Sequence, residues 1–323
     1  MKVLKVAIKL GVLAGIIGLV LIFCDMRAIF DATSRAGLTT VAAAFGLSII
    51  VIAVNAVKWH LSVPTARIAV LFRILIISYF YSFFFVGQAS GEAAKMYMLS
   101  RASGHAGGAV VSVFADRWTS FIGMLLATVI SFAFSPSKYP VSLQAISVIG
   151  LAVLIALLLT LRHDAVFELA ERIVTRLDRS TRRWTRTVTF LRQAIEQWHV
   201  AVRNLSRVSI GSLMGTLIHI GNVLVVIILA RGVGINVNFF DWCWIVGVIS
   251  IAGMIPITVG YVTANGIMAA LLHVLGVPIS DAVAVAVLLI AVHLLLALVG
   301  ALIAWLRWGQ PRTWSARSPA SGA

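Results

Sequence analysis

The sequence predicts an all-α integral membrane protein, with about six transmembrane helices and two re-entrant helical hairpins in an inverted-repeat arrangement. Three observations lead to this fold class. Apolar residues make up 61% of the 323 residues and charged residues only 11%, and the mean hydropathy is +1.03. Apolar stretches of about 20 residues, the length that crosses a bilayer, recur along the chain. Two further apolar stretches are interrupted by glycine, proline and polar residues.

This composition argues against a separate soluble catalytic domain, since the longest polar stretch, 162–207, is only the size of a loop insert. The net charge of +15 would suggest a nucleic-acid partner for a soluble protein. In a membrane protein, basic residues beside apolar spans instead mark cytoplasmic loops and favour anionic lipid headgroups. We therefore expect membrane lipids, and no nucleic acid, as partners.

Six plain spans are expected to cross the membrane, within one membrane domain that covers 1–323. The first, 4–23, resembles a secretory signal but lacks a small-x-small cleavage site, so we expect an uncleaved anchor. The other five are 38–57, 107–134, 141–161, 208–230 and 282–306. The polar tail, 309–323, is expected to be disordered.

The two interrupted stretches, 68–86 and 241–276, are expected to enter the membrane and return to the same side. The cytoplasmic segments then hold 21 of the 26 lysines and arginines, Lys58 among them. The positive-inside rule favours this topology, with both termini on the cytoplasmic side of the cytoplasmic membrane. Segments 38–134 and 208–306 then form two repeats of opposite orientation, an arrangement typical of transporters.

The cytoplasmic insert 162–207 is predicted to form an amphipathic helical hairpin. Apolar residues recur in it at alternating spacings of four and three, which places them on one stripe of a helix. The stripe consists of Trp184, Val188, Leu191, Ile195, Trp198, Val202 and Leu205. Such a hairpin lies on the membrane surface or packs against a partner. A soluble synthase bound there, or a homo-oligomer, is consistent with the pattern.

The first interrupted stretch ends in VGQASGEAAKMYMLSR, residues 86–101. Gly91 is followed by Glu92, and Lys95 lies one helical turn further on. A charged group facing hydrocarbon costs on the order of 3 kcal/mol or more, so these side chains are expected to line a protein-enclosed polar cavity. The alternative is that they lie in the cytoplasmic headgroup layer.

Asp116 and Arg117 lie about ten residues into their predicted span. Intramembrane charges are candidates for function. The alternative is a buried ion pair that fixes helix packing. Adjacent residues point about 100° apart on a helix, so Arg117 is free to face Glu92 or a phosphate, which its planar guanidinium suits.

In the second half, His219 and Asn222 are spaced to share one helix face, and Asn265 follows a break at Pro256 and Gly260. Free helix ends at such a break offer partial charge to a headgroup or ion. No metal-ligand spacing, phosphate-binding loop, dinucleotide fingerprint or nucleophile elbow occurs in the sequence. We therefore expect no metal and no cofactor.

These stretches resemble the transmembrane region of the lysylphosphatidylglycerol synthase family, a flippase-like domain also found in free-standing form. In the family, the first break reads as a proline, a glycine pair, an acid and an arginine. Here the corresponding residues are Val86, Ser90, Gly91, Glu92 and Lys95, and Arg117 matches the intramembrane arginine. In the stretch IPITVGYVTANGIMAALLHVLGVP, Pro256 and Gly260 match. The family's next glycines, arginine and glutamate fall on Tyr261, Thr263, Asn265 and Gly266.

The resemblance implies that the protein moves a lipid or lipid-linked headgroup between leaflets. It does not imply aminoacyl transfer, which a separate soluble domain performs in that family. The expected headgroup site consists of Gly91, Glu92, Lys95, Asp116 and Arg117, with His219, Asn222, Pro256, Gly260 and Asn265 as further candidates. The alternatives are a membrane-embedded lipid or glycosyl transferase with Glu92 or Asp116 as base, an accessory subunit of one, or a scaffold for a synthase.

Overall fold

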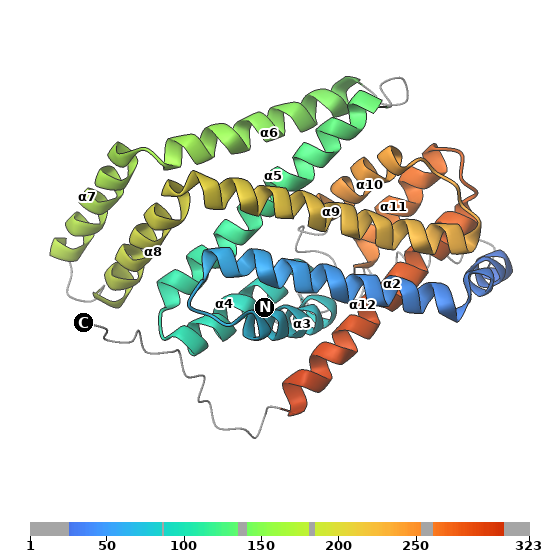
Figure 1. Cartoon of the computed structure of the whole chain (residues 1–323), viewed down its shortest axis with the longest axis horizontal. Coiled ribbons are helices and arrows are strands. Elements are labelled where there is room, and N and C mark those ends of the chain that lie inside the picture. The colour runs from blue at the N-terminus through green and yellow to red at the C-terminus, as the bar shows by residue number, and fades with distance from the viewer. Residues whose placement is uncertain (1–25, 86, 135–140, 181–184, 253–260, 307–323) are drawn as a thin grey trace. The chain divides into compact units, whose positions relative to one another are not determined.

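The computed structural model describes residues 26–85, 87–134, 141–180, 185–252 and 261–306 (Figure 1). Within these ranges the chain forms eleven helices, α2 to α12, and no strand. Five of the helices are long and apolar enough to cross a membrane. The prediction of an all-α, multi-pass membrane protein is therefore confirmed. The predicted first span, 4–23, and the tail, 309–323, lie outside the described residues.

Each of the five remaining predicted spans corresponds to one long helix. These helices are α2 (Met26–Ser62), α5 (Ala106–Phe134), α6 (Val141–Leu161), α9 (Leu205–Val233) and α12 (Ile279–Leu306). The largest difference concerns α2, which continues past the predicted end at residue 57 and so carries Lys58 inside the helix. Gly37, with φ 70° and ψ 163°, divides α2 into two helical segments.

Both interrupted stretches correspond to short helices. The first, 68–86, contains α3 (Ile68–Phe84), and α4 (Gly87–Ser103) follows it. In the second, α10 (Phe239–Ala252) and α11 (Val262–Val274) flank residues that the structure does not describe. Helices of 13 to 17 residues are short for a crossing of the hydrocarbon core, which needs about 20 residues. That they return to the side of entry stays a prediction.

The contacts within the chain group into two compact units. The first unit takes in the described residues of Met1–Ile52, Leu75–Glu92 and His219–Trp308. The second unit takes in those of Ala53–Ile74 and Ala93–Ile218. Helices α2, α3, α4 and α9 each contribute to both units.

In the second unit, α7 (Asp164–Ser180) and α8 (Thr185–Arg203) form the predicted helical hairpin, and Figure 1 shows them side by side. The apolar stripe of α8 has its partner within the chain, because α8 packs along α5. Ile195, Trp198 and Val202 belong to a cluster with residues of α5, α6 and α7, which include Trp118, Ile122, Leu158 and Phe167. The Trp118 and Trp198 rings meet edge to face, with centroids 6.1 Å apart.

Helices α5 and α9 approach closely in the second unit because both carry glycine where they cross. A Cβ on Gly123 would lie 2.4 Å from the backbone nitrogen of Thr216, and one on Gly215 would lie 2.6 Å from the carbonyl oxygen of Thr119. The hydroxyl of Thr216 donates a hydrogen bond to the carbonyl oxygen of Gly123 over 3.1 Å. Small residues and interhelical hydrogen bonds of this kind hold membrane helices together.

In the first unit, α11 packs against both α10 and α12. Gly91 allows α4 to approach α3, since a Cβ there would lie 2.0 Å from the hydroxyl oxygen of Ser82. Near the starts of α2 and α12, Arg35 and Asp281 form an ion pair over 2.7 Å, and the Arg35 side chain is 57% exposed.

The crossing of α5 and α9 predicts a difference between two glycine substitutions. Gly123→Ala should lower the free energy of unfolding by about 1–3 kcal/mol, because the added methyl group meets backbone atoms that cannot rotate away. Gly46→Ala on α2 is the matched control, since among the described residues no atom lies within 4 Å of the added Cβ. Thermal unfolding in detergent tests this, and equal melting temperatures for the two variants would contradict the packing described above.

Candidate functional site

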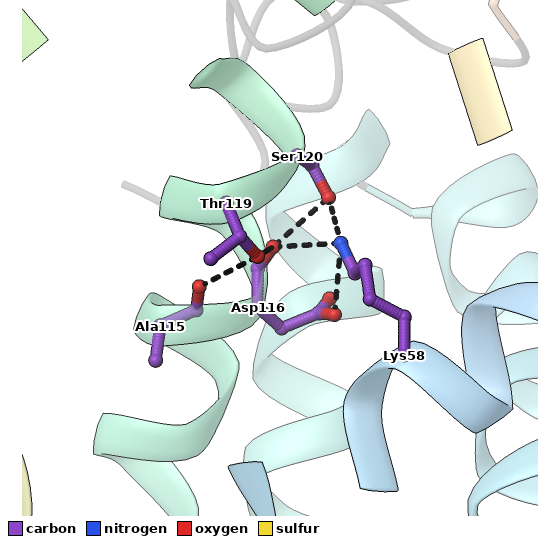
Figure 2. Close-up of polar contacts among 5 residues, drawn as sticks. All are labelled: Lys58, Ala115, Asp116, Thr119 and Ser120. Atoms are coloured by element: carbon purple, nitrogen blue, oxygen red, sulfur yellow. Dashed lines mark hydrogen bonds and ion pairs between the residues drawn. The ribbon is translucent and has the colours of Figure 1, made fainter. Parts of the chain in front are cut away.

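The most buried charged residues of the second unit are Lys58 on α2 and Asp116 on α5. Their side chains are 1% and 2% exposed, and Lys58 Nζ lies 3.1 Å from Asp116 Oδ1. Figure 2 shows that the ammonium group points at the α5 backbone as well as at the carboxylate. Lys58 Nζ donates to the carbonyl oxygen of Asp116 over 2.9 Å and also to the hydroxyl oxygen of Ser120.

Lys58 thus donates two hydrogen bonds to α5, and its ammonium group forms an ion pair with the Asp116 carboxylate. The carbonyl oxygen of Asp116 also accepts hydrogen bonds from Thr119 Oγ1 (3.0 Å) and Ser120 Oγ (2.9 Å), as Figure 2 shows. A buried ion pair is tolerated where the geometry is good and the remaining polar atoms are hydrogen-bonded. For Asp116, the structure therefore favours the structural alternative, an ion pair that fixes the end of α2 against α5.

Two further cations lie near this ion pair. Lys95 on α4 is 3% exposed, and its Nζ lies 5.5 Å from the centroid of the Trp59 ring. A lysine at this distance over an indole face gains from the cation–π interaction. Trp59 follows Lys58 on α2 and is fully buried. The ion pair and the cation–π contact therefore fix adjacent residues of the same helix.

Arg117 follows Asp116 on α5 and is half-buried. The charges of Arg117 and Lys95 both act on Lys58. Lys58, Lys95, Arg117 and Asp116 thus lie within electrostatic reach of one another in the second unit. Cationic side chains within apolar helices attract an anionic group.

Glu92 and Gly91 lie in the part of α4 that belongs to the first unit. Glu92 is half-buried, one helical turn before Lys95, and Gly91 is buried against α3. The close contact with Ser82 gives Gly91 a packing role. Ser90 Oγ donates to the carbonyl oxygen of Tyr81 over 2.7 Å, which also holds α4 to α3.

Three candidates of the second half, His219, Asn222 and Asn265, lie within the described residues. His219 is buried, and its Nε2 lies 2.9 Å from the carbonyl oxygen of Cys243, a hydrogen bond that links α9 to α10. Asn222 is exposed although it follows one turn later on α9. Asn265 is buried on α11. Pro256 and Gly260 lie outside the described residues. His219 and Asn222 therefore differ in environment, which their spacing alone did not predict.

Metal binding finds no support in the part of the chain that the structure describes. There, no group of three or more histidine, cysteine, aspartate or glutamate residues is placed to hold a metal ion.

Comparison with known proteins gives one match. The family model for the "Lysylphosphatidylglycerol synthase TM region" matches residues 6–308, nearly the whole chain. The chain belongs to this family. No curated protein and no solved structure matches. Membership indicates a function that concerns membrane lipids.

In this member of the family, the residues that the sequence analysis missed are Lys58 and Trp59. Lys58 was assigned to a cytoplasmic segment because hydropathy places the end of the span just before it. The signal that could have found it is the charge at Asp116, since a buried carboxylate needs a cation. Lys58 directly follows the predicted end of an apolar span, so an extension of the helix by a few residues includes it in α2.

The Lys58–Asp116 ion pair predicts a non-additive stability effect. Lys58→Met should lower the free energy of unfolding by about 3–5 kcal/mol, because the Asp116 carboxylate is left buried without its cation. The double variant Lys58→Met/Asp116→Leu should recover most of the loss, because no buried charge remains.

Arg35→Met, which breaks the largely exposed pair with Asp281, is the matched control and should cost less than about 1 kcal/mol. The measurement is thermal unfolding of the purified variants in detergent. A double variant that is no more stable than Lys58→Met alone would show that the ion pair is not what holds α2 to α5.

Proposed function

We propose that the protein moves an amphipathic lipid or lipid-linked precursor with an anionic, phosphate-bearing headgroup between the leaflets of the cytoplasmic membrane. The observation that carries this proposal is that Lys95 and Arg117 lie near the Lys58–Asp116 ion pair of the second unit, where their charges act on Lys58. Lys95 and Arg117 are the proposed headgroup ligands. Lys58 and Asp116 hold the helices that position them.

We assign these roles from the surroundings of each cation. Lys58 makes two hydrogen bonds and an ion pair with α5, so it holds the two helices together. Lys95 lies over the Trp59 ring, and Arg117 carries five donors in a planar arrangement that suits a phosphate. A phosphate that enters beside them gains two cations and replaces its lost water.

The acyl chains of such a substrate remain in the bilayer, so only the headgroup needs a polar surface within the protein. The short helices α3, α4, α10 and α11 supply the interruptions of regular helix that transporters use at their binding sites. We propose that these helices form two re-entrant hairpins in inverted repeats, with both chain termini in the cytoplasm. The α7–α8 hairpin then lies on the cytoplasmic side, where it is the proposed docking point for a soluble synthase.

A transferase with Asp116 as its base is the less favoured function. The Asp116 carboxylate is engaged by Lys58 and lies only 2% exposed. A general base needs access to the proton that it removes.

The proposal predicts that Lys95→Gln and Arg117→Gln each slow lipid movement by about tenfold or more, the effect of losing one hydrogen bond to a charged group. The measurement is the rate at which a fluorescent anionic phospholipid leaves the inner leaflet of proteoliposomes that contain the purified protein. A labelled phosphatidylcholine serves as the zwitterionic comparison.

Arg101→Gln is the matched control, because Arg101 is an exposed arginine in the last turn of α4. It removes one positive charge from the same helix and should leave the rate unchanged. Movement of the anionic lipid no faster than in protein-free liposomes would overturn the proposal. So would an equal loss of rate in all three variants, because net charge and not the buried cations would then decide.

A further inference from the structure

The first unit contains a second polar cluster, centred on His293 in α12. His293 lies fourteen residues after the start of this 28-residue helix, at its midpoint. The imidazole stacks on the Tyr261 ring, with centroids 4.4 Å apart and planes 16° apart. It also stacks on the Tyr79 ring at 6.3 Å and 21°. We call these three residues the Tyr–His–Tyr stack. A polar residue at the centre of an apolar span is a candidate for function.

Tyr261 reaches His293 from a strained position. It has φ 63° and ψ 8°, and among the described residues it is the only non-glycine with positive φ. A tyrosine in this conformation persists only where the surroundings enforce it, and such strain gathers at functional sites. Tyr261 is the N-cap residue of α11, and its side chain makes no capping hydrogen bond. Its ring stacks on the His293 imidazole instead.

Stacking fixes the plane of the imidazole and leaves its edge for polar contacts. At this edge His293 Nδ1 is buried, and among the described residues no hydrogen-bond partner reaches it. Asn265 lies one turn after Tyr261, with its backbone N–H donating to the Tyr261 carbonyl oxygen over 3.0 Å. Asn265 is 1% exposed, and its Nδ2 likewise finds no partner within the described ranges. Buried polar atoms are nearly always hydrogen-bonded, so two unmet nitrogens on the packed helices α11 and α12 are candidates for binding a ligand.

The two helices that carry Tyr261, Asn265 and His293 indicate a neutral ligand. No Lys, Arg, Asp or Glu occurs in α11, and α12 carries only Asp281, which pairs with Arg35. The charged residues of the helices beside them are Arg73 of α3, in the second unit, and Asp241, in the first turn of α10. An anion or cation bound at the stack would find no available counter-charge on α11 or α12, and burial of an isolated ion is strongly unfavourable. A hydroxyl group has the matching chemistry, because its oxygen can accept a hydrogen bond from Asn265 Nδ2–H and its proton can be donated to a ring nitrogen of His293.

We propose that the Tyr–His–Tyr stack and Asn265 bind a neutral hydroxyl-bearing part of a lipid headgroup, such as a sugar or polyol. The inference rests on the proposed function only in taking the ligand to be a lipid. It adds a determinant of substrate choice to the charge-based site of the second unit, with the chemistry of hydroxyl recognition. Sites built to bind a hydroxyl group reject analogues that lack it, because their polar atoms are then left unmet.

The test compares two neutral lipids, a glucosyl diacylglycerol and a matched lipid in which a cyclohexyl ring replaces the glucose. Neither carries a phosphate, so Lys95 and Arg117 gain nothing from either. Binding to the full-length protein in detergent is measured by native mass spectrometry. We expect the wild type to prefer the glucosyl lipid by about tenfold or more. His293→Phe keeps an aromatic ring in the stack, and Asn265→Leu keeps the side-chain volume. Each should reduce the preference to less than about threefold, with unchanged affinity for the cyclohexyl lipid.

His273→Phe is the control, because His273 is an exposed histidine at the end of α11. It should keep the wild-type preference. An unchanged affinity for the cyclohexyl lipid shows that the variants are folded.

Two outcomes would overturn the inference. One is a wild type that binds both lipids equally, as expected if a water molecule satisfies both nitrogens. The other is a preference for the glucosyl lipid that both variants retain. Selective binding without lipid movement in proteoliposomes would overturn the proposed function and leave this inference standing. Movement of the anionic lipid, together with equal binding of the glucosyl and cyclohexyl lipids, would support the proposed function and overturn this inference.

Discussion

The Lys58–Asp116 ion pair is the interaction on which the organisation of the second unit depends. In an apolar span no water can replace a missing partner, so the lysine and the carboxylate must meet, and the end of α2 must lie beside the middle of α5. Both hydrogen bonds of the ammonium group and its ion pair are made with α5. The ion pair therefore also fixes the positions of the residues that follow its members in sequence, Trp59 on α2 and Arg117 on α5. Lys95 over Trp59 and Arg117 on α5 are therefore positioned by a pair of charges that need not touch a ligand.

The spans were predictable because the bilayer imposes a length and a composition that a single sequence displays directly. The ends of the spans were less predictable. Hydropathy places the end of the second predicted span at residue 57, whereas α2 continues to Ser62 and includes Lys58, which pairs with Asp116. Hydropathy assigns a charged residue at the end of a span to a loop, unless a partner of opposite charge is known. That partner lies 58 residues away in the sequence, and no local pattern connects the two.

The candidate site was predictable where charge stands out against an apolar background, as at Lys95, Asp116 and Arg117. It was not predictable where the signal is a single polar or aromatic residue in an apolar helix. Tyr79, Tyr261 and His293 come from three helices, and only the fold stacks their rings. The apolar stripe of α8 shows the converse. Its period correctly indicated a buried helix face, but a membrane surface, a partner protein and the chain's own α5 satisfy such a face equally well.

The polar groups on which the two proposals rest differ in kind. In the second unit they are charged, with the Lys58–Asp116 ion pair beside Lys95 and Arg117. In the first unit, which also buries the Asp241 carboxylate, they are neutral, with Asn265 and His293 each retaining an unmet nitrogen. A charge attracts any anionic headgroup from a distance, whereas hydrogen-bonding nitrogens discriminate only on contact. A lipid transporter needs both properties, because anionic lipids share the phosphate and differ in what is attached to it. In the two proposals, attraction by charge and selection by hydroxyl recognition are therefore separable, because they depend on residues of different helices.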